Sequence, residues 1–201
     1  MRKFALFLTL SLCLFQVTQA GNVRVRVQDG TGRSLTDAVV FLESAAAKSL
    51  VKSASGSEIA QVGKQFVPSV TVVPVGSLVQ FPNRDTVRHH VYSFSPAKTF
   101  ELKLYTGTAA SPVLFDRPGI VVLGCNIHDH MTAWVVVVET PYFGKSTEAG
   151  EVTLANVAPG SYKLRAWHTS LPVGAAALEQ SLTVGATDTA VVVVDLKGAK
   201  P

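Results

Sequence analysis

The segment IVVLGCNIHDHMTAWVVVV, residues 120–138, sets the expected fold of this chain. Two apolar, β-branched runs, 120–123 and 133–138, flank a short polar loop, a pattern typical of two strands joined at one end of a sheet. The loop carries three candidate metal ligands at spacings of three and three: Cys125, His128 and Met131. A thiolate, an imidazole and a thioether gathered between two strands predict a metal-binding loop.

Strand patterns extend over the rest of the chain. Apolar and polar residues alternate in 23–27 and 100–104, which gives the period of two of half-buried strands. Gly- and Pro-containing turn sequences separate the strands, and only 44–51 and 174–180 have a briefly helical pattern. Further β-rich runs cover residues 70–75, 78–81, 90–94, 152–154, 162–167 and 190–194. We therefore expect an all-β fold made of two sandwiches.

The first twenty residues, 1–20, have the pattern of an export signal peptide. Arg2 and Lys3 precede an apolar run, 4–17, which is followed by the small-x-small cleavage signature Thr18-Gln19-Ala20. We expect a periplasmic or secreted mature chain that begins at residue 21. No later segment reaches the ~20 consecutive apolar residues of a transmembrane helix, so no stable membrane span is expected.

Removal of the signal changes the charge and the sulfur content. Lys and Arg fall from 18 to 16 against 14 Asp and Glu, and this balance gives no reason to expect a nucleic-acid partner. Of two cysteines and two methionines, Cys13 and Met1 leave with the signal, so Cys125 and Met131 remain. A lone cysteine forms no internal disulfide, and an idle thiol outside the cytoplasm is open to oxidation. Coordination to a metal removes that liability.

Residues 66–138 resemble a cupredoxin, the family of blue copper proteins. The resemblance rests on Phe66-Val67-Pro68, on the segment 75–81 and on the Cys-x-x-His-x-x-Met loop, whose short spacing is similar to that of amicyanin. It implies a Greek-key sandwich with one copper ion near one end and transfer of single electrons. Cys125 and His128 would then be ligands, with Met131 as the axial ligand by position.

The resemblance also implies a first histidine ligand upstream. Residues 81–91 resemble the segment of plastocyanins and amicyanins in which a strand ends at an asparagine and a His-Asn-Val follows. Matching Asn83 to that asparagine makes His89 the ligand. His90 then stands where the family has an asparagine, and His90 stays open as an alternative to His89.

His130 is a second alternative, because its spacing of five residues from Cys125 occurs in cupredoxins with longer loops. As the equatorial ligand in place of His128, it would be adjacent in sequence to Met131, which would strain a shared metal site. We therefore expect His130 at the solvent edge.

The two ends of the chain resemble parts of one carboxypeptidase regulatory-like, transthyretin-like sandwich. Residues 23–43 are similar to its opening, and residues 148–164, with the turn Ala158-Pro159-Gly160, are similar to a later strand pair. The resemblance implies that 21–54 and 144–198 form a smaller immunoglobulin- or transthyretin-like sandwich, into which a cupredoxin domain, 55–143, is inserted.

The predicted function is that of a type 1 copper protein that carries single electrons between redox partner proteins, such as a periplasmic dehydrogenase or cytochrome. The chain has no Gly-x-Ser-x-Gly elbow and no Gly-rich phosphate loop after a strand, so an enzyme is not expected. Two other functions stay open. One is a copper-binding or delivery module without fast electron transfer, in which His90 and His130 take part, and the other is a structural β-sandwich binding module.

Overall fold

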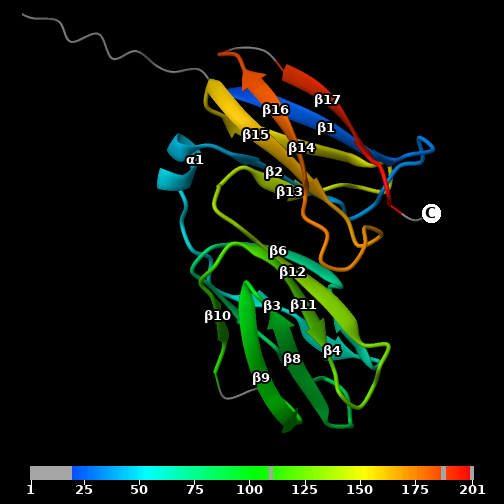
Figure 1. The fold of residues 1–201 in the computed structure, drawn as a ribbon. Helices are drawn as coiled ribbons and strands as arrows, with labels where there is room; N and C mark the ends of the chain where they lie inside the picture. Colours follow the sequence, from blue (N-terminus) through cyan, green and yellow to red (C-terminus); the bar gives the residue numbers. More distant parts are fainter. Residues whose placement is uncertain (1–19, 109–110, 187–188, 200–201) are drawn as a thin grey trace, which may run out of the picture.

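The computed structural model describes residues 20–108, 111–186 and 189–199, so the expected export signal lies outside it except for Ala20. These ranges form strands throughout, with one short α-helix, and the expected all-β class is confirmed. Two β-sandwiches are stacked end to end (Figure 1). Within the same ranges, no helix combines the length and the apolar character that a membrane crossing demands.

One sandwich, here called the terminal sandwich, is built from both ends of the chain (Figure 1). Its first sheet has the order β14-β1-β17, and its second sheet has the order β13-β2-β15-β16. The strands are β1 (Gly21–Asp29), β2 (Val39–Glu43), β13 (Phe143–Lys145), β14 (Glu151–Val157), β15 (Gly160–Trp167), β16 (Leu178–Val184) and β17 (Thr189–Leu196).

Strand β1 joins the beginning of the chain to its end. It runs antiparallel to β14 and parallel to β17, so Val25 lies beside both Val152 and Val192. Its valines are buried and its arginines are exposed, which matches the alternation in the sequence. The buried side of β1 therefore faces the second sheet and forms the core of the terminal sandwich.

The other sandwich, here called the central sandwich, contains residues 120–138. A sheet of order β6-β12-β11-β8-β9 faces a smaller sheet of order β10-β7-β3, and β4 and β5 form a hairpin. The strands are β3 (Ser57–Glu58), β4 (Ala60–Val62), β5 (Gln65–Val67), β6 (Val70–Pro74), β7 (Ser77–Gln80), β8 (His89–Ser95), β9 (Lys98–Tyr105), β10 (Val113–Phe115), β11 (Gly119–Gly124) and β12 (Thr132–Val138).

A third hydrophobic cluster joins the two sandwiches. It contains Val39 and Phe41 of β2, Val136 and Val138 of β12, and Trp167 of β15. Alternate residues of β2 and β12 enter the two sandwich cores, so both faces of these strands are buried. A strand buried on both faces has a continuous apolar sequence, which explains the run of valines in 135–138.

The expected strand runs all fall on strands, but one helical expectation is wrong. Residues 44–51 contain α1 (Ala45–Ser49), whose N-cap Ser44 accepts a hydrogen bond from the backbone N–H of Ala47 at 3.0 Å. Residues 174–180 instead form a turn and the start of β16, in which Leu178 pairs with Ala166. Pairing with β15 overrides the local helix propensity of this Ala- and Leu-containing segment.

Candidate metal centre

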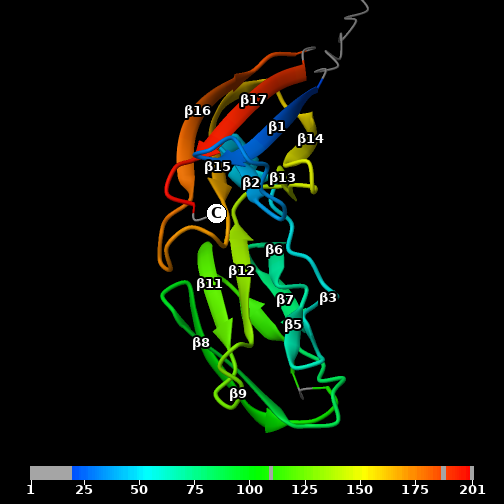
Figure 2. The same ribbon diagram turned by 90° about the vertical axis from the view of Figure 1, so that its right-hand side faces the viewer.

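Neighbouring strands bring three candidate ligands to one end of the central sandwich. Cys125 directly follows β11, His128 lies in the loop before β12, and His89 is the first residue of β8. The ligand atoms of these three residues all lie within 4.8 Å of one another. Strand β12 runs from this loop toward the terminal sandwich, so the cluster lies at the far end of the central sandwich (Figure 2).

His89 is fully buried, and one of its two ring nitrogens has no hydrogen-bond partner in the part of the chain that the structure describes. Nε2 lies 2.7 Å from Oδ2 of Asp85, and because an ionised carboxylate only accepts, Nε2 carries the proton. In the neutral ring Nδ1 then has a free lone pair, and among the described residues this buried atom has no hydrogen-bond partner. A buried polar atom left unpaired costs about 1–3 kcal/mol. A copper ion bound to Nδ1 would satisfy this atom, so the environment of His89 fits the metal that the sequence implies.

Cys125 and His128 complete the cluster. Sγ of Cys125 lies 3.8 Å from Nδ1 of His128, and Cys125 is buried while His128 is half-buried. Burial of the imidazole is the largest effect that holds the pKa of His128 below its usual range. A lowered pKa favours the neutral imidazole, which is the form that binds a metal.

Met131 closes the loop that carries these ligands. Its backbone N–H donates to the carbonyl of His128 at 2.9 Å, and its side chain is buried in the same hydrophobic core cluster as Cys125. Its assignment as the axial ligand stays a prediction.

The two alternative histidines lie elsewhere. Nε2 of His90 is 2.8 Å from Oε1 of Glu101, and its ring centroid is 5.6 Å from that of Tyr92. Successive side chains of a strand point to opposite faces, so His90 points away from the face that carries His89. His130 is exposed, as expected, with its ring centroid 6.1 Å from that of His128. Of the candidates, the structure gathers His89, Cys125 and His128, and places His90 and His130 outside that group.

Asp85, which the sequence pattern did not single out, contacts the ring of His89 through Nε2. Both oxygens of Asp85 accept backbone hydrogen bonds, from Gly63 at 2.7 Å and from Lys64 at 2.8 Å. The Lys64 donor makes the largest contribution to holding the pKa of Asp85 below its usual range. The amide of Asn83 donates to the carbonyls of Val87 and Tyr105, which ties the 84–88 loop to β9. The position of an acidic residue four places before His89 was the available signal in the sequence.

A hydrogen-bond network around the half-buried Tyr105 lies beside the cluster. The hydroxyl of Tyr105 donates to the carbonyl of Phe81 and accepts from the side-chain amide of Gln61. Burial raises the pKa of Tyr105, and the nearby Cys125 adds to this effect. Tyr105 pairs with His89 across β8 and β9, so this network fixes the strand end that carries the histidine.

Tyr92 covers the backbone next to Cys125 from the outer face of the sheet. It pairs with Gly124, and a Cβ at Gly124 would lie 2.8 Å from Cζ of Tyr92. A side chain at position 124 would therefore force the Tyr92 ring or the backbone to move, because the ring and the backbone before the cysteine are in direct contact.

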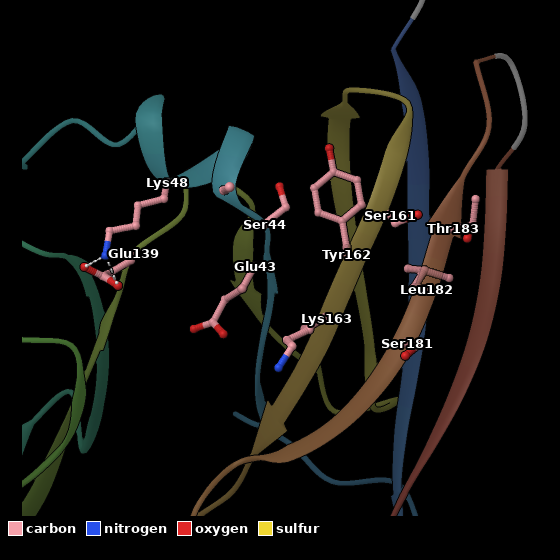
Figure 3. A pocket seen from close by; sticks show the side chains of 11 residues that line it. Glu43, Ser44, Lys48, Glu139, Ser161, Tyr162, Lys163, Ser181, Leu182 and Thr183 are labelled. Carbon is pink, nitrogen blue, oxygen red and sulfur yellow. Dashed lines mark hydrogen bonds and ion pairs between the residues drawn. The ribbon is translucent and has the colours of Figure 1, made fainter.

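A groove of about 760 Å³ lies on the terminal sandwich, away from the cluster (Figure 3). Its wall includes the ion pair between Lys48 of α1 and Glu139, at 2.8 Å. Charged and hydroxyl side chains make up most of the lining: Glu43, Ser44, Lys48, Glu139, Ser161, Tyr162, Lys163, Ser181 and Thr183. None of the described residues that line this groove carries a thiol or an imidazole, so its chemistry is unlike that of the metal centre.

Comparisons with known proteins give similarity to cupredoxins among solved structures. A reduced amicyanin mutant is 19% identical over 49% of this chain and 98% of its own, with a TM-score of 0.38. The purple cupredoxin from Nitrosopumilus maritimus is 22% identical over 41% of this chain and 100% of its own, with a TM-score of 0.34. The copper-containing nitrite reductase from Thermus scotoductus is 26% identical over 41% of this chain, with a TM-score of 0.38, but the match spans only 22% of the reductase. No protein-family model and no curated protein matches the chain. The TM-scores are low, so these likenesses do not establish membership of a family.

Proposed function

We propose that this chain is a mononuclear copper protein that carries single electrons. The observation that carries the proposal is the convergence of Cys125 Sγ with ring nitrogens of His89 and His128 within 4.8 Å of one another. A thiolate with two imidazoles and a weak axial thioether, here Met131, is the ligand set of blue copper. When bound, one copper ion supplies a Cu(II)/Cu(I) couple.

The surroundings of the three ligands support a carrier. His89 and Cys125 are buried, and β8, which begins at His89, and β11, which Cys125 directly follows, are each paired with a strand on both sides, so the sheet fixes their positions. A fixed ligand set undergoes little rearrangement when the redox state changes, and a small rearrangement favours fast transfer. The half-buried His128 is the ligand nearest to solvent and gives a redox partner protein access to the site.

The same geometry makes a delivery module the weaker candidate. That function needs an open site in which His90 and His130 take part, whereas His90 is paired with Glu101 and His130 lies on the exposed side of the loop. We further propose that the chain is not an enzyme, that it works in the periplasm or outside the cell, and that the two sandwiches are its domains. Their proposed ranges are 21–54 with 144–198, and 55–143.

The proposal is tested by loading the mature protein with Cu(II) and recording its visible absorption. Wild type is expected to show an intense thiolate-to-copper band and a reversible one-electron potential. Cys125→Ser, which keeps the size of the side chain, is expected to remain folded and colourless. A folded wild type that stays colourless with bound Cu(II) contradicts the proposal.

Stopped-flow electron exchange with a small redox mediator separates a carrier from a delivery module. Fast exchange without loss of copper supports the carrier. Slow exchange, together with rapid release of copper to a chelator, favours delivery.

A further inference from the structure

We infer that Asp85 is a positioning residue for the metal centre, and that the turn of the β4–β5 hairpin holds it in place. The inference rests on the proposed function, since it concerns how His89 is prepared to bind copper. Neither the carboxylate of Asp85 nor the β4–β5 hairpin supplies a proposed copper ligand.

The carboxylate of Asp85 has three donors in a fixed arrangement. Oδ1 accepts from the backbone N–H of Gly63 at 2.7 Å, and Oδ2 accepts from that of Lys64 at 2.8 Å and from Nε2 of His89 at 2.7 Å. The backbone N–H of Asp85 in turn donates to Oδ1 of Asn83 at 3.0 Å. Hydrogen bonds to an ionised acceptor are about twice as strong as those between neutral groups. Three such bonds therefore hold the carboxylate of Asp85 firmly in one position.

The hairpin turn supplies two of these donors because of its backbone conformation. Gly63 and Lys64 have φ angles of 59° and 57°, and two successive left-handed residues form the type I′ turn of a two-residue hairpin. In this turn the N–H groups of both residues reach the same carboxylate. The hairpin is itself fixed, since the carbonyl of Gln61 accepts from the N–H of Arg84 at 2.9 Å. A segment about twenty residues upstream therefore determines where Asp85 lies.

Two consequences for His89 follow from the position of Asp85. An ionised carboxylate at Nε2 fixes the proton there and leaves Nδ1 free, so the ring has the tautomer and orientation for metal binding before the metal arrives. The carboxylate also places a negative charge behind the ligand. Negative charge stabilises Cu(II) more than Cu(I), so Asp85 lowers the reduction potential of the centre.

The first test uses the tautomer of His89 in the metal-free mature protein, read from the ¹⁵N shifts of the imidazole. Wild type is expected to show the single tautomer with the proton on Nε2, and Asp85→Ala is expected to show a mixture. The same variant is expected to bind copper about 10- to 100-fold more weakly in competition with a chelator. An unchanged tautomer and an unchanged affinity in folded Asp85→Ala would overturn the inference.

A matched pair of variants tests the charge and does not depend on the folding of Asp85→Ala. Asp85→Asn and Asp129→Asn each remove one negative charge without a change in size, and Asp129 is exposed next to His128. We expect Asp85→Asn to raise the midpoint potential of the copper-loaded protein more than Asp129→Asn does. Equal shifts would mean that Asp85 acts only as a distant charge, which also overturns the inference.

The two proposals fail in different ways. A wild type that binds no copper rejects the proposed function, while the tautomer measurement on the metal-free protein still decides whether Asp85 positions His89.

Discussion

The contact between Gly124 and Tyr92 gives a prediction that links packing to the metal centre. In Gly124→Ala, the new Cβ would lie 2.8 Å from Cζ and 2.9 Å from Oη of Tyr92. Carbon atoms in favourable contact are about 3.5–4.0 Å apart, so either the ring or the backbone must move. The ring has His90 and Phe94 on either side along β8, at centroid distances of 5.6 and 5.2 Å, which restricts its movement.

The cost follows from this overpacking. An added methyl group in a well-packed site costs about 1–3 kcal/mol, and the backbone of Gly124 lies outside the left-handed region, so steric contact is the main term. Chemical denaturation of the metal-free protein is expected to show this loss. Because Cys125 is the next residue, the visible band of the copper-loaded variant is expected to shift as well.

A double-mutant cycle isolates the contact. In a Tyr92→Ala background the ring atoms are absent, so Gly124→Ala is expected to be neutral or to stabilise by up to about 1 kcal/mol through the lower flexibility of alanine. The reasoning is refuted if Gly124→Ala costs the same free energy in both backgrounds.

Three further predictions concern the terminal sandwich and its contact with the central one. Ser146→Ala leaves the buried N–H of Ala38 without its acceptor and should cost about 1–3 kcal/mol in chemical denaturation; no measurable loss would contradict this. Trp167→Ala, in the cluster between the sandwiches, should cost about 3–5 kcal/mol by calorimetry, and a loss below this range would mean that the junction contributes little. Hydrogen bonds, of which that from the side chain of Thr31 has the largest effect, lower the pKa of Asp29 from its ordinary value of 3.8. Ionised Asp29 therefore stabilises the fold above pH 3.8, and this stabilisation is lost as the pH falls through the lower pKa of the folded state. Asp29→Asn should therefore flatten the acid side of the stability profile, and an unchanged profile would rule this out.

Much of the fold could be read from local sequence. The strand runs and the loop between β11 and β12 depend on alternation, β-branched residues and turn residues within a few positions, and these patterns act over short distances along the chain. The segment 174–180 shows where local patterns fail, because its conformation is decided by pairing with β15 and not by its own propensity.

In the candidate site, too, some features follow from local sequence and others depend on the fold. The sequence alone determined the spacing of Cys125, His128 and Met131, since one loop carries all three. Only the tertiary structure decided that His89 and not His90 joins Cys125 and His128, because that depends on which face of β8 points into the sandwich. Only the tertiary structure likewise shows that β1 pairs with β17 and that the backbone N–H of Gly63 donates to Asp85. Both contacts join residues that are distant in the chain. Such contacts form because burial and hydrogen bonding favour them in the folded state, so a local sequence pattern does not predict them.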